Sequence, residues 1–575
     1  MSPLPVPTTP RDRRALLWLL LAAVVVLGAG IGLRDPWPAD EPRFALVARQ
    51  MVESGDWLFP HRGIELYPDK PPMLMWLQGL SYLVVGDWRI AFLLPSLLSG
   101  LLTLVLVWDL GRRWWSPRAG WLAALAVLSA LMFTFQFKRA QIDPLVTALL
   151  TLAHWGVLRH LVDGPNWRAL WLGAFAAGLA VITKVVGVLV PLMLLPYLLM
   201  RRGGWPRVTP VIAARADAWR WTLAVLAFVA GAAIWLAPML WTALSRGTPE
   251  YLGYVNNVLF HQTADRYVGV LRQHIRPFYE YVPIVLLEFL PLSLAYGAGA
   301  RDAAAAWRAR DARVWLPLAW AILVFLFFSA AAGKREVYIL PILPMLALAL
   351  APTLERIADA RWLHVAALAL AGLLGTGLLA AGLWAASGQW RWLETMAAVR
   401  GLTDEAPALA RWVTVAGATW LVAAAVGRVR RGMHALLAGL AVFWLIWGLA
   451  ITPLANRAVS AAGVMAVADR LAGPQGEIGL VKWKEQDMLM APRPVRDFGF
   501  RAPGAVQFDR AVAWLAQAPE RRWVFALGTA VAPCVERSAA TVIGHSDRRE
   551  WWMFQSPAVR PGCRLPEVPG DDDEP

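Results

Sequence analysis

Carboxylates and cations in three separate segments are the residues best suited to chemistry. Asp40 and Arg43 lie in a polar stretch at residues 35–72, which ends with the run YPDKPP that holds Asp69 and Lys70. A third acid, Asp143, stands in the run FKRAQIDPL. A carboxylate can act as a general base or ligate a metal, and lysine and arginine can hold a phosphate. The pattern therefore indicates a site for a phosphate-bearing ligand.

Each of these acids also has a purely structural interpretation. Asp143, followed by Pro144, fits the first turn of a helix, where the dipole favours a negative charge. Asp40 could begin a solvated helix, and Asp69 could be a turn residue before proline. The functional interpretation rests on their convergence at one level of a membrane, where ionisable groups are usually functional.

The composition is that of an integral membrane protein. Hydrophobic residues make up 58% of the chain and charged residues 17%, whereas a soluble chain has about 45–50% and about 25%. Apolar runs of about 20 residues predict membrane helices and exclude barrel strands. The net charge of +15 would suggest nucleic acid in a soluble chain. Here the Lys and Arg residues sit mostly in short loops, so we expect no nucleic-acid partner and a cytoplasmic excess of positive charge.

The distribution of basic loops predicts the topology. Residues 1–14 are basic and should be cytoplasmic, and residues 15–455 should form an all-α polytopic domain with about thirteen spans. The expected spans lie near residues 15–33, 90–110, 119–137, 144–160, 167–183, 185–200, 219–242, 280–297, 314–332, 337–352, 363–386, 408–427 and 433–452. Residues 73–87 are too short to span comfortably and should lie at the outer surface. The parity of spans then places Asp40, Asp69 and Asp143 at one outer face, in or near a catalytic loop at residues 34–87.

Residues 456–575 have an ordinary soluble composition and should form a small α/β domain on the outer side. The runs GEIGLVKW and RRWVFALG predict strands, and FDRAVAWLAQAP predicts an amphipathic helix. Both cysteines, Cys534 and Cys563, lie in this segment. A disulfide between them is compatible with an oxidising compartment.

Several basic residues break the positive-inside pattern by falling near the outer ends of spans. They are Arg43, Lys70, Lys138, Arg139, Lys184, Lys334 and Arg335. Contact with lipid headgroups would explain each of them singly. Together they indicate an anionic ligand at the outer leaflet.

Three runs carry a resemblance to a known family. DEPRFALVARQMVESGDWLFP, LYPDKPPMLMWL and KREVYILPILPMLALAL, together with an Asp-Pro pair that opens a span, resemble membrane glycosyltransferases of the GT-C fold. The similarity covers residues 15–350 and includes the lipid A aminoarabinose transferases and the protein O-mannosyltransferase-like enzymes of glycosyltransferase family 39. It implies an inverting transfer of a sugar from an undecaprenyl or other polyprenyl phosphate carrier. The acceptor would be lipid A or another envelope component, and the transfer would occur at the periplasmic face of a bacterial inner membrane.

The resemblance also implies a role for each candidate residue. Asp40 matches a loop carboxylate at the reaction centre, and Asp143 matches a second acid in the same cavity. The residues that would hold the donor phosphate are Arg43, Tyr67, Lys70, Lys334 and Tyr338. Asp69 stands where the aminoarabinose transferases have glutamate. It could ligate a divalent metal, the one cofactor considered, together with His261 or His274.

Two other classes of function remain open from the sequence. A transporter or flippase of polyprenyl-linked sugars would need paired charges near the bilayer midplane and broken helices, whereas the charges here fall at the outer ends of spans. A structural or sensor protein would give the acids no role. Within the enzyme class, the acceptor could be lipid A, a protein Ser/Thr as in the O-mannosyltransferases, or another envelope glycan.

Overall fold

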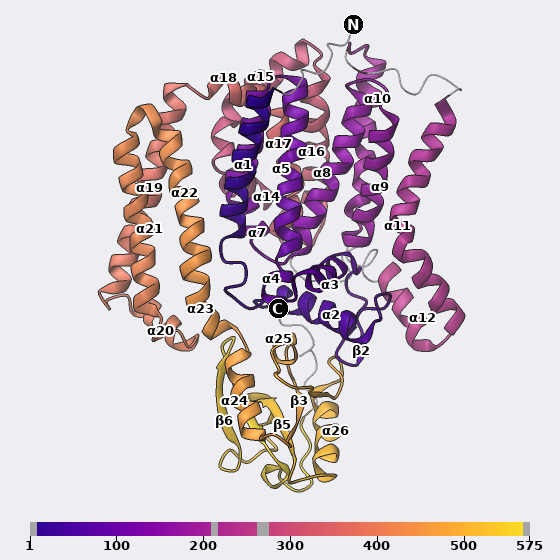
Figure 1. Ribbon diagram of the computed structural model, residues 1–575, viewed down its shortest axis with the longest axis vertical. Helices are drawn as coiled ribbons and strands as arrows, with labels where there is room; N and C mark the ends of the chain where they lie inside the picture. The colour runs from indigo at the N-terminus through magenta and orange to yellow at the C-terminus, as the bar shows by residue number, and fades with distance from the viewer. Residues whose placement is uncertain (1–8, 207, 209–216, 261–274, 567–575) are drawn as a thin grey trace.

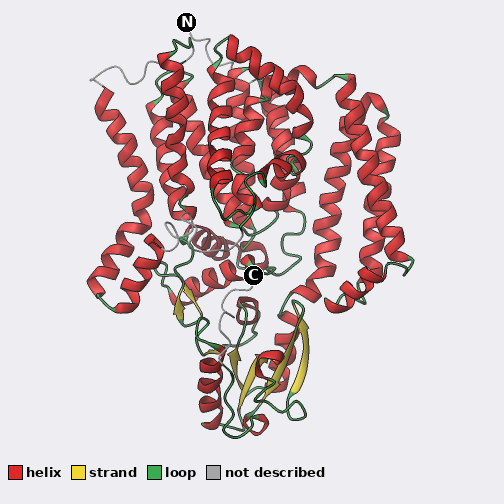
Figure 2. Ribbon diagram, turned by 180° about the vertical axis from the view of Figure 1, so that it is seen from behind, coloured by secondary structure: helices red, strands yellow, loops and turns green. Residues whose placement is uncertain are grey.

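The protein consists of an upright bundle of helices with a small α/β domain below it (Figure 1). The structure, a computed structural model, describes residues 9–206, 208, 217–260 and 275–566. The N-terminal helix rises to the end of the bundle opposite the C-terminal domain. We call the end nearest that domain the domain end. Within the described ranges, strands occur in the C-terminal domain and in one short hairpin near the domain end (Figure 2).

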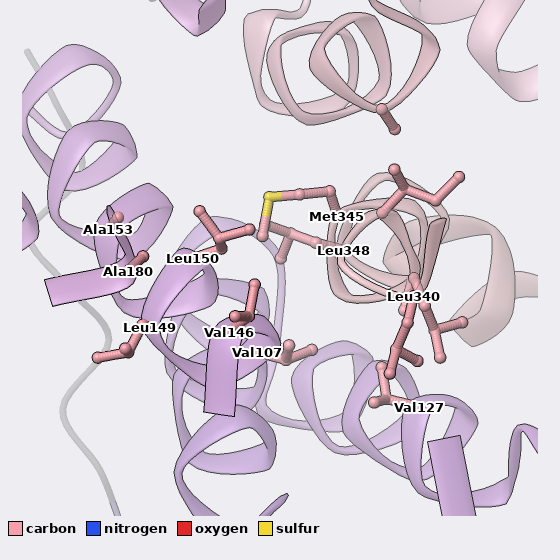
Figure 3. Close-up of a cluster of buried hydrophobic side chains, with 14 of the residues drawn as sticks. Val107, Val127, Val146, Leu149, Leu150, Ala153, Ala180, Leu340, Met345 and Leu348 are labelled. Carbon is pink, nitrogen blue, oxygen red and sulfur yellow. The ribbon is translucent and has the colours of Figure 1, made fainter. Parts of the chain in front are cut away.

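The first half of the bundle is built from long helices that stand side by side. They are α1 (Pro10–Gly28), α5 (Leu94–Trp114), α8 (Ile142–Leu161), α9 (Trp167–Lys184), α11 (Ala218–Arg246) and α16 (Ala312–Ala330). Small residues let neighbouring helices approach closely, as is common in membrane proteins. A Cβ atom on Gly111 of α5 would lie 2.6 Å from the Cα atom of Gly120, and one on Gly156 of α8 would lie 2.8 Å from that of Gly173. Apolar side chains from these helices, including Val107, Val146 and Leu150, fill the space between them (Figure 3).

Four of the expected continuous spans are broken into shorter helices. The span near residues 119–137 is α6 (Pro117–Ser129) and α7 (Leu131–Phe137), bent by 66°. The span near 280–297 turns by 94° between α14 (Tyr281–Leu287) and the segment formed by η4 (Leu292–Ala295) and α15 (Tyr296–Arg308). The other two consist of η1 (Val186–Met193) and α10 (Leu194–Arg202), and of η5 (Glu336–Ile339), α17 (Ile342–Ala349) and α18 (Ala351–Ile357). Hydropathy does not detect these breaks, because the residues on both sides of each break are apolar.

The second half of the chain adds a separate group of helices beside the main bundle (Figure 1). Its members are α19 (Arg361–Ala386), α20 (Arg391–Val399), α21 (Ala406–Gly427), η6 (Val429–Arg431), α22 (Gly432–Ile446), η7 (Trp447–Ile451) and α23 (Thr452–Val459). Near the domain end, α12 (Pro249–Asn256) follows α11.

Six helical segments within the described ranges are long and apolar enough to cross a membrane, or eight if each of two bent pairs counts as one span. The protein is therefore a multi-pass membrane protein, and the expected number of thirteen spans is not confirmed. The six segments do not include α1, α8 and α9, although these helices stand in the same bundle (Figure 1). They carry charged residues, such as Asp143 and Arg159 of α8.

A layer of short elements lies across the domain end. It contains α2 (Asp40–Ser54), the hairpin of β1 (His61–Arg62) and β2 (Glu65–Leu66), α3 (Met73–Val85) and α4 (Trp88–Ala91). Helix α3 is the apolar segment that is too short to span comfortably, and it lies beside α2 between the bundle and the C-terminal domain (Figure 1).

The C-terminal domain is a five-stranded mixed sheet with helices. The strands are β3 (Glu477–Val481), β4 (Arg496–Asp497), β5 (Arg522–Leu527), β6 (Thr541–Ser546) and β7 (Arg549–Phe554), in the order β4-β3-β5-β7-β6. The helices are α24 (Ala462–Ala472), α25 (Glu485–Leu489), α26 (Gly504–Ala516), α27 (Gly528–Val531) and η8 (Ser556–Ala558). The two strands and the helix predicted from the sequence are β3, β5 and α26. Cys534 and Cys563 form a disulfide.

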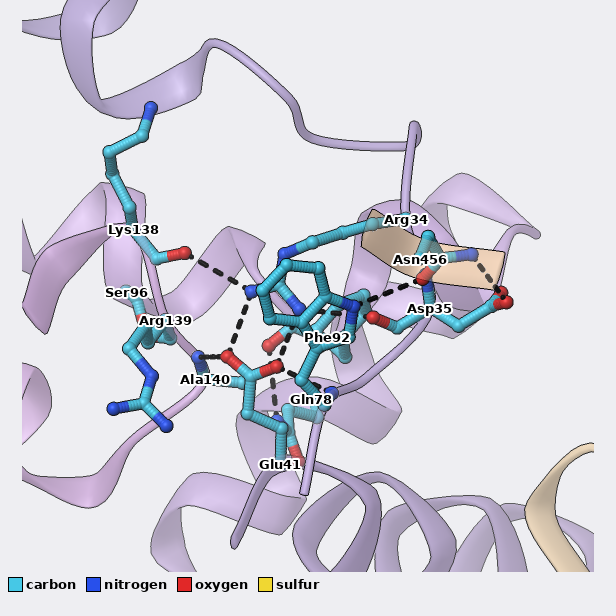
Figure 4. A network of polar contacts seen from close by, with 11 residues as sticks. Arg34, Asp35, Glu41, Gln78, Phe92, Ser96, Lys138, Arg139, Ala140 and Asn456 are labelled. Carbon is cyan, nitrogen blue, oxygen red and sulfur yellow. Dashed lines mark hydrogen bonds and ion pairs between the residues drawn. The ribbon is translucent and has the colours of Figure 1, made fainter. Parts of the chain in front are cut away.

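A buried ion pair fixes the start of α2 to the bundle. The guanidinium of Arg34 donates to both oxygens of the Glu41 carboxylate, at 2.5 and 2.8 Å, and the Glu41 side chain is fully buried. Glu41 also accepts the backbone N–H of Ala140 at 2.9 Å, and Arg34 donates to the carbonyl of Lys138 (Figure 4). Burial alone would raise the pKa of Glu41, but Arg34 and the other donors hold the pKa below its ordinary value. Glu41 therefore stays ionised and ties α2 to the loop before α8.

A neighbouring carboxylate ties the same region to α23. The Asp35 carboxylate accepts from Asn456 at 3.0 Å (Figure 4). It also accepts from Ser460 at 2.7 Å and pairs with Arg89 of α4 at 2.8 Å. The chain segment that leads into the C-terminal domain is thus attached directly to the segment that leads into α2.

The Arg34–Glu41 pair yields a test of this anchor. Replacing Glu41 with Gln leaves a buried guanidinium without its counter-charge, which costs about 3–5 kcal/mol. We expect a clear fall in the melting temperature of the purified protein in detergent. The control is Glu53→Gln, which breaks the exposed i,i+4 pair between Glu53 and Arg49 and should change stability by no more than about 0.5 kcal/mol. Equal melting temperatures for the two variants would contradict the anchoring role.

The buried acid Asp487 of α25 gives a prediction about pH. Burial raises the pKa of Asp487 to about 8, and its Oδ1 atom has no hydrogen-bond partner within the described part of the chain. The folded protein therefore holds a proton that the unfolded chain releases near its ordinary pKa. The contribution to stability is complete below about pH 4 and is lost as the pH rises towards 8, by up to about 1.4 kcal/mol per pH unit.

Hydrogen exchange of amides in α25 and β3, followed from pH 5 to pH 8, measures this effect. We expect protection, corrected for intrinsic exchange, to fall with rising pH in the wild type and to vary less in Asp487→Asn. A variant with the same pH dependence as the wild type would show that another group is responsible.

Candidate active site

Helix α2 presents Asp40 at its first residue, where the helix dipole favours a carboxylate. Two guanidiniums from different segments approach that carboxylate. Arg43 Nη1 lies 3.7 Å from Asp40 Oδ1, and Arg335 Nη2 lies 3.6 Å from Asp40 Oδ2. The Arg335 side chain is about half exposed and that of Asp40 is 18% exposed. Asp40 is therefore a reachable carboxylate that is flanked by two guanidiniums.

A second candidate acid, Asp143, lies three residues after Ala140, whose backbone N–H donates to Glu41. Asp143, in the first turn of α8, pairs with Lys184 Nζ at 2.5 Å, and Lys184 lies at the last residue of α9. The same ammonium stands 4.5 Å from the centre of the Tyr338 ring. Tyr338 and Arg335 both belong to the segment around η5. The structure therefore links Asp143 to Tyr338 through Lys184, and Asp40 to the same segment through Arg335.

Tyr67 lies fully buried within a group of cations. Arg62 stacks with its guanidinium carbon 5.2 Å from the centre of the Tyr67 ring, and the charge of Arg43 also acts on the Tyr67 hydroxyl. That hydroxyl has no hydrogen-bond partner among the residues that the structure describes. Burial raises the pKa of Tyr67 well above its ordinary value, so the hydroxyl stays protonated. A buried donor without a partner, beside two guanidiniums, suits a bound anion.

Two of the predicted phosphate ligands are used in local structure. The Lys334 ammonium is buried and donates to the backbone carbonyls of Arg276 and Ala331, at 3.1 and 2.5 Å. It therefore holds the turn before η5, and the adjacent Arg335 is the residue that reaches Asp40. Lys70 Nζ donates to the carbonyl of Asp69 at 3.1 Å.

The predicted metal ligands do not form a complete set in the described ranges. Asp69 pairs with Arg501 of the C-terminal domain at 2.7 Å, and no group of three His, Cys, Asp or Glu side chains suited to a metal occurs among the described residues. His261 and His274 lie outside the described residues. The groups present do not fit a metal centre by themselves, and we derive no chemical step through one.

Three functional candidates could not be identified from the sequence. Arg62 sits in β1, and Glu485 and Arg501 belong to the C-terminal domain, more than 400 residues from the loop that they contact. Glu485 Oε1 accepts from Arg43 Nε at 2.9 Å and from Arg62 Nη1 at 3.2 Å. No sequence motif marks these residues, because they become neighbours only when the C-terminal domain folds against the loop.

A small apolar cavity opens beside the Arg34–Glu41 pair. Its volume is about 260 Å³. The lining includes Leu27 of α1, Phe137 of α7 and Trp447 of η7, together with Lys138 and Arg139. The Lys138 Nζ atom donates to the carbonyls of Val26 and Ala29, at 2.8 and 2.7 Å. The cavity therefore combines apolar walls with the guanidinium of Arg139, which suits part of an anionic lipid.

Known proteins share both sequence and fold with this chain. Residues 69–235 match the family model described as dolichyl-phosphate-mannose-protein mannosyltransferase. The chain is 32% identical over 324 residues to undecaprenyl phosphate-alpha-4-amino-4-deoxy-L-arabinose arabinosyl transferase 2 of Proteus mirabilis. The aligned region covers 55% of each protein. It is 34% identical over 369 residues to transferase 1 of the same name from Sodalis glossinidius, which covers 60% of this chain and 61% of that protein. These matches thus span a little over half the length of the relatives.

The similarity of fold extends further than the similarity of sequence. The crystal structure of ArnT from Cupriavidus metallidurans bound to undecaprenyl phosphate superimposes with a TM-score of 0.71 at 22% identity, covering 93% of this chain and 97% of that one. At this identity the likeness establishes the fold. The resemblance seen in the sequence is therefore confirmed: the chain has the GT-C fold and is similar to the membrane glycosyltransferases of the aminoarabinose transferase type.

Proposed function

We propose that this protein is an inverting glycosyltransferase. It moves a sugar from a polyprenyl phosphate, such as undecaprenyl phosphate, to an envelope acceptor such as lipid A. The observation that carries the proposal is the position of Asp40, an accessible carboxylate between Arg43 and Arg335 at 3.7 and 3.6 Å. The names of the relatives, which are arabinosyl transferases of an undecaprenyl phosphate-linked amino sugar, agree with this chemistry.

In this proposal the domain end faces the periplasm. The chain would cross the inner membrane about thirteen times, with the N-terminus in the cytoplasm. Basic residues at the opposite end of the bundle support this orientation under the positive-inside rule. They include Arg112 and Arg113 at the end of α5, and Arg201 and Arg202 at the end of α10 (Figure 1).

The reaction would proceed as a single displacement at the anomeric carbon. An acceptor oxygen forms a bond to that carbon while the bond to the carrier phosphate breaks, and the phosphate leaves with the electron pair. Arg43, Arg335 and the Tyr67 hydroxyl would stabilise the developing negative charge. If the acceptor is a hydroxyl, Asp40 takes its proton as the general base. If the acceptor is a phosphate, Asp40 orients it or stabilises positive charge on the sugar ring.

Asp143 would act through the segment that carries Tyr338. The pairing of Asp143 with Lys184 keeps the Lys184 ammonium beside the Tyr338 ring. Lys184 and Tyr338 would then face the donor phosphate together with Lys70. A divalent ion held by Asp69 with His261 or His274 stays a prediction from the sequence, because Asp69 pairs with Arg501 and both histidines lie outside the described residues. No step of the proposed reaction requires it. The apolar cavity beside Lys138 would accommodate a portion of a lipid substrate.

A second candidate differs only in the acceptor. The match of residues 69–235 to a protein mannosyltransferase model supports transfer to a protein Ser or Thr hydroxyl. Asp40 would then be required as a base, because a neutral hydroxyl must lose its proton.

Replacement of Asp40 by Asn tests the proposed function. We expect sugar transfer to fall at least about 100-fold, because a positioned general base or charge stabiliser contributes about 10²–10⁴-fold. Mass spectrometry of envelope lipids and glycans from cells with wild-type, variant or no protein identifies the modification that is lost. The control is Asp359→Asn, which alters an exposed pair with Arg118 and should leave the modification unchanged. An unaltered profile in Asp40→Asn, with the protein present in the membrane, would refute the assignment of Asp40.

A further inference from the structure

One carboxylate of the C-terminal domain reaches into the candidate site. Glu485 lies at the first residue of α25 with its side chain 6% exposed. Its Oε1 atom accepts from Arg43 Nε at 2.9 Å and from Arg62 Nη1 at 3.2 Å. A single buried carboxylate thus holds two guanidiniums from two different elements, α2 and β1.

The hydrogen bond to Glu485 determines how the Arg43 guanidinium is turned. Its Nε edge is used by Glu485, and its Nη1 atom lies on the side of Asp40 at 3.7 Å. Arg62 is held equally firmly, because its guanidinium also stacks 3.8 Å from the centre of the Phe500 ring, another residue of the C-terminal domain. The N–H groups of Arg43 that Glu485 does not use are therefore available on the side of Asp40.

The C-terminal domain is fastened to the loop by contacts that do not involve Glu485. Arg49 of α2 donates to the Leu489 carbonyl at 2.8 Å, and the Ile64 backbone N–H donates to Asp497 at 3.0 Å. Arg501 pairs with Asp69 at 2.7 Å, and its backbone N–H donates to Glu65 at 3.0 Å. Because these contacts remain, a change at Glu485 should reorient Arg43 and Arg62 without releasing the domain.

We propose that Glu485 is a positioning residue, through which the C-terminal domain completes the binding site for the donor phosphate. It orients Arg43 and Arg62 towards the phosphate and keeps Arg43 from closing fully onto Asp40. This inference rests on the proposed function, since it assigns a source of order to the phosphate ligands of that site.

The direction in which Glu485→Gln changes the affinity for a lipid phosphate distinguishes a positioning role of Glu485 from a purely electrostatic one. Removing a negative charge beside two arginines raises the local positive potential, so by charge alone Glu485→Gln would bind a lipid phosphate more tightly. If Glu485 orients the arginines, the same change weakens binding, because charge-assisted hydrogen bonds require correct geometry. The two explanations therefore predict opposite outcomes.

The experiment measures binding of undecaprenyl phosphate, without sugar, to full-length protein in nanodiscs. We expect Glu485→Gln to raise the Kd about tenfold and to raise the KM for the sugar-linked donor by a similar factor, and the melting temperature is measured for this variant and for the control. The control is Glu477→Gln, because Glu477 is 40% exposed and pairs with Arg521 and Arg522 within the C-terminal domain. Unchanged or tighter binding by Glu485→Gln would overturn the inference.

A second variant keeps the inference testable if Glu485→Gln destabilises the protein. If Glu485→Gln melts well below the control, Glu485→Asp takes its place. It keeps the charge but withdraws the carboxylate by one methylene group, so a positioning role again predicts a raised Kd, and a Kd equal to that of the wild type overturns it. If the wild type itself binds no lipid phosphate, the proposed function fails. If the wild type binds and the variants bind equally well, only the role of Glu485 fails.

Discussion

The arrangement of the candidate site depends on the buried ion pair between Arg34 and Glu41. Two charges removed from water are stable only when each is satisfied by the other and by further hydrogen bonds, and both conditions are met here. Glu41 also accepts the backbone N–H of Ala140, three residues before Asp143. One buried carboxylate thus fixes the start of α2, which carries Asp40, relative to the start of α8, which carries Asp143.

The remaining charges at the domain end are arranged as pairs drawn from distant segments. Asp40 faces Arg335, Asp143 faces Lys184, and Glu485 faces Arg43 and Arg62. Such pairing lowers the cost of holding ionised groups near a membrane surface. The pairs at Asp40, at 3.6 and 3.7 Å, are longer than the others. That difference distinguishes Asp40, whose more distant partners leave its carboxylate 18% exposed, from Glu41, whose carboxylate is fully buried against Arg34.

The ends of two short helical segments lie close to charged residues of the domain end. Helix α7 ends just before Lys138 and Arg139, and η5 begins one residue after Arg335. An irregular backbone at membrane depth is tolerated where it is buried in protein or lines a cavity, and Lys138 and Arg139 line the apolar cavity next to Glu41. The C-terminal domain has a comparable role from the other side, because α25 packs directly on α2. It contributes Glu485 to the site and is more than an appended module.

The sequence by itself determined that the protein is a polytopic membrane protein and predicted the residues of the candidate site. Runs of apolar residues predict membrane helices because a bilayer leaves few alternatives for the backbone, and the motifs around Asp40, Lys70 and Lys334 were sufficient to indicate the GT-C family. Within the C-terminal domain, two apolar runs predicted β3 and β5, and an amphipathic pattern predicted α26. The disulfide between Cys534 and Cys563 agrees with the pairing that the sequence allowed.

Only the tertiary structure decided which charges meet. Asp40 and Glu41 are adjacent and chemically alike, yet one is accessible and the other is fully buried with Arg34. Lys334 and Arg335 differ in the same way: the first is used by backbone carbonyls and the second reaches Asp40. The helix breaks and the contribution of Glu485 were also invisible in the sequence. The reason is physical, because burial and pairing depend on how separate segments pack in three dimensions, up to 442 residues apart for Arg43 and Glu485, and no local pattern records that packing.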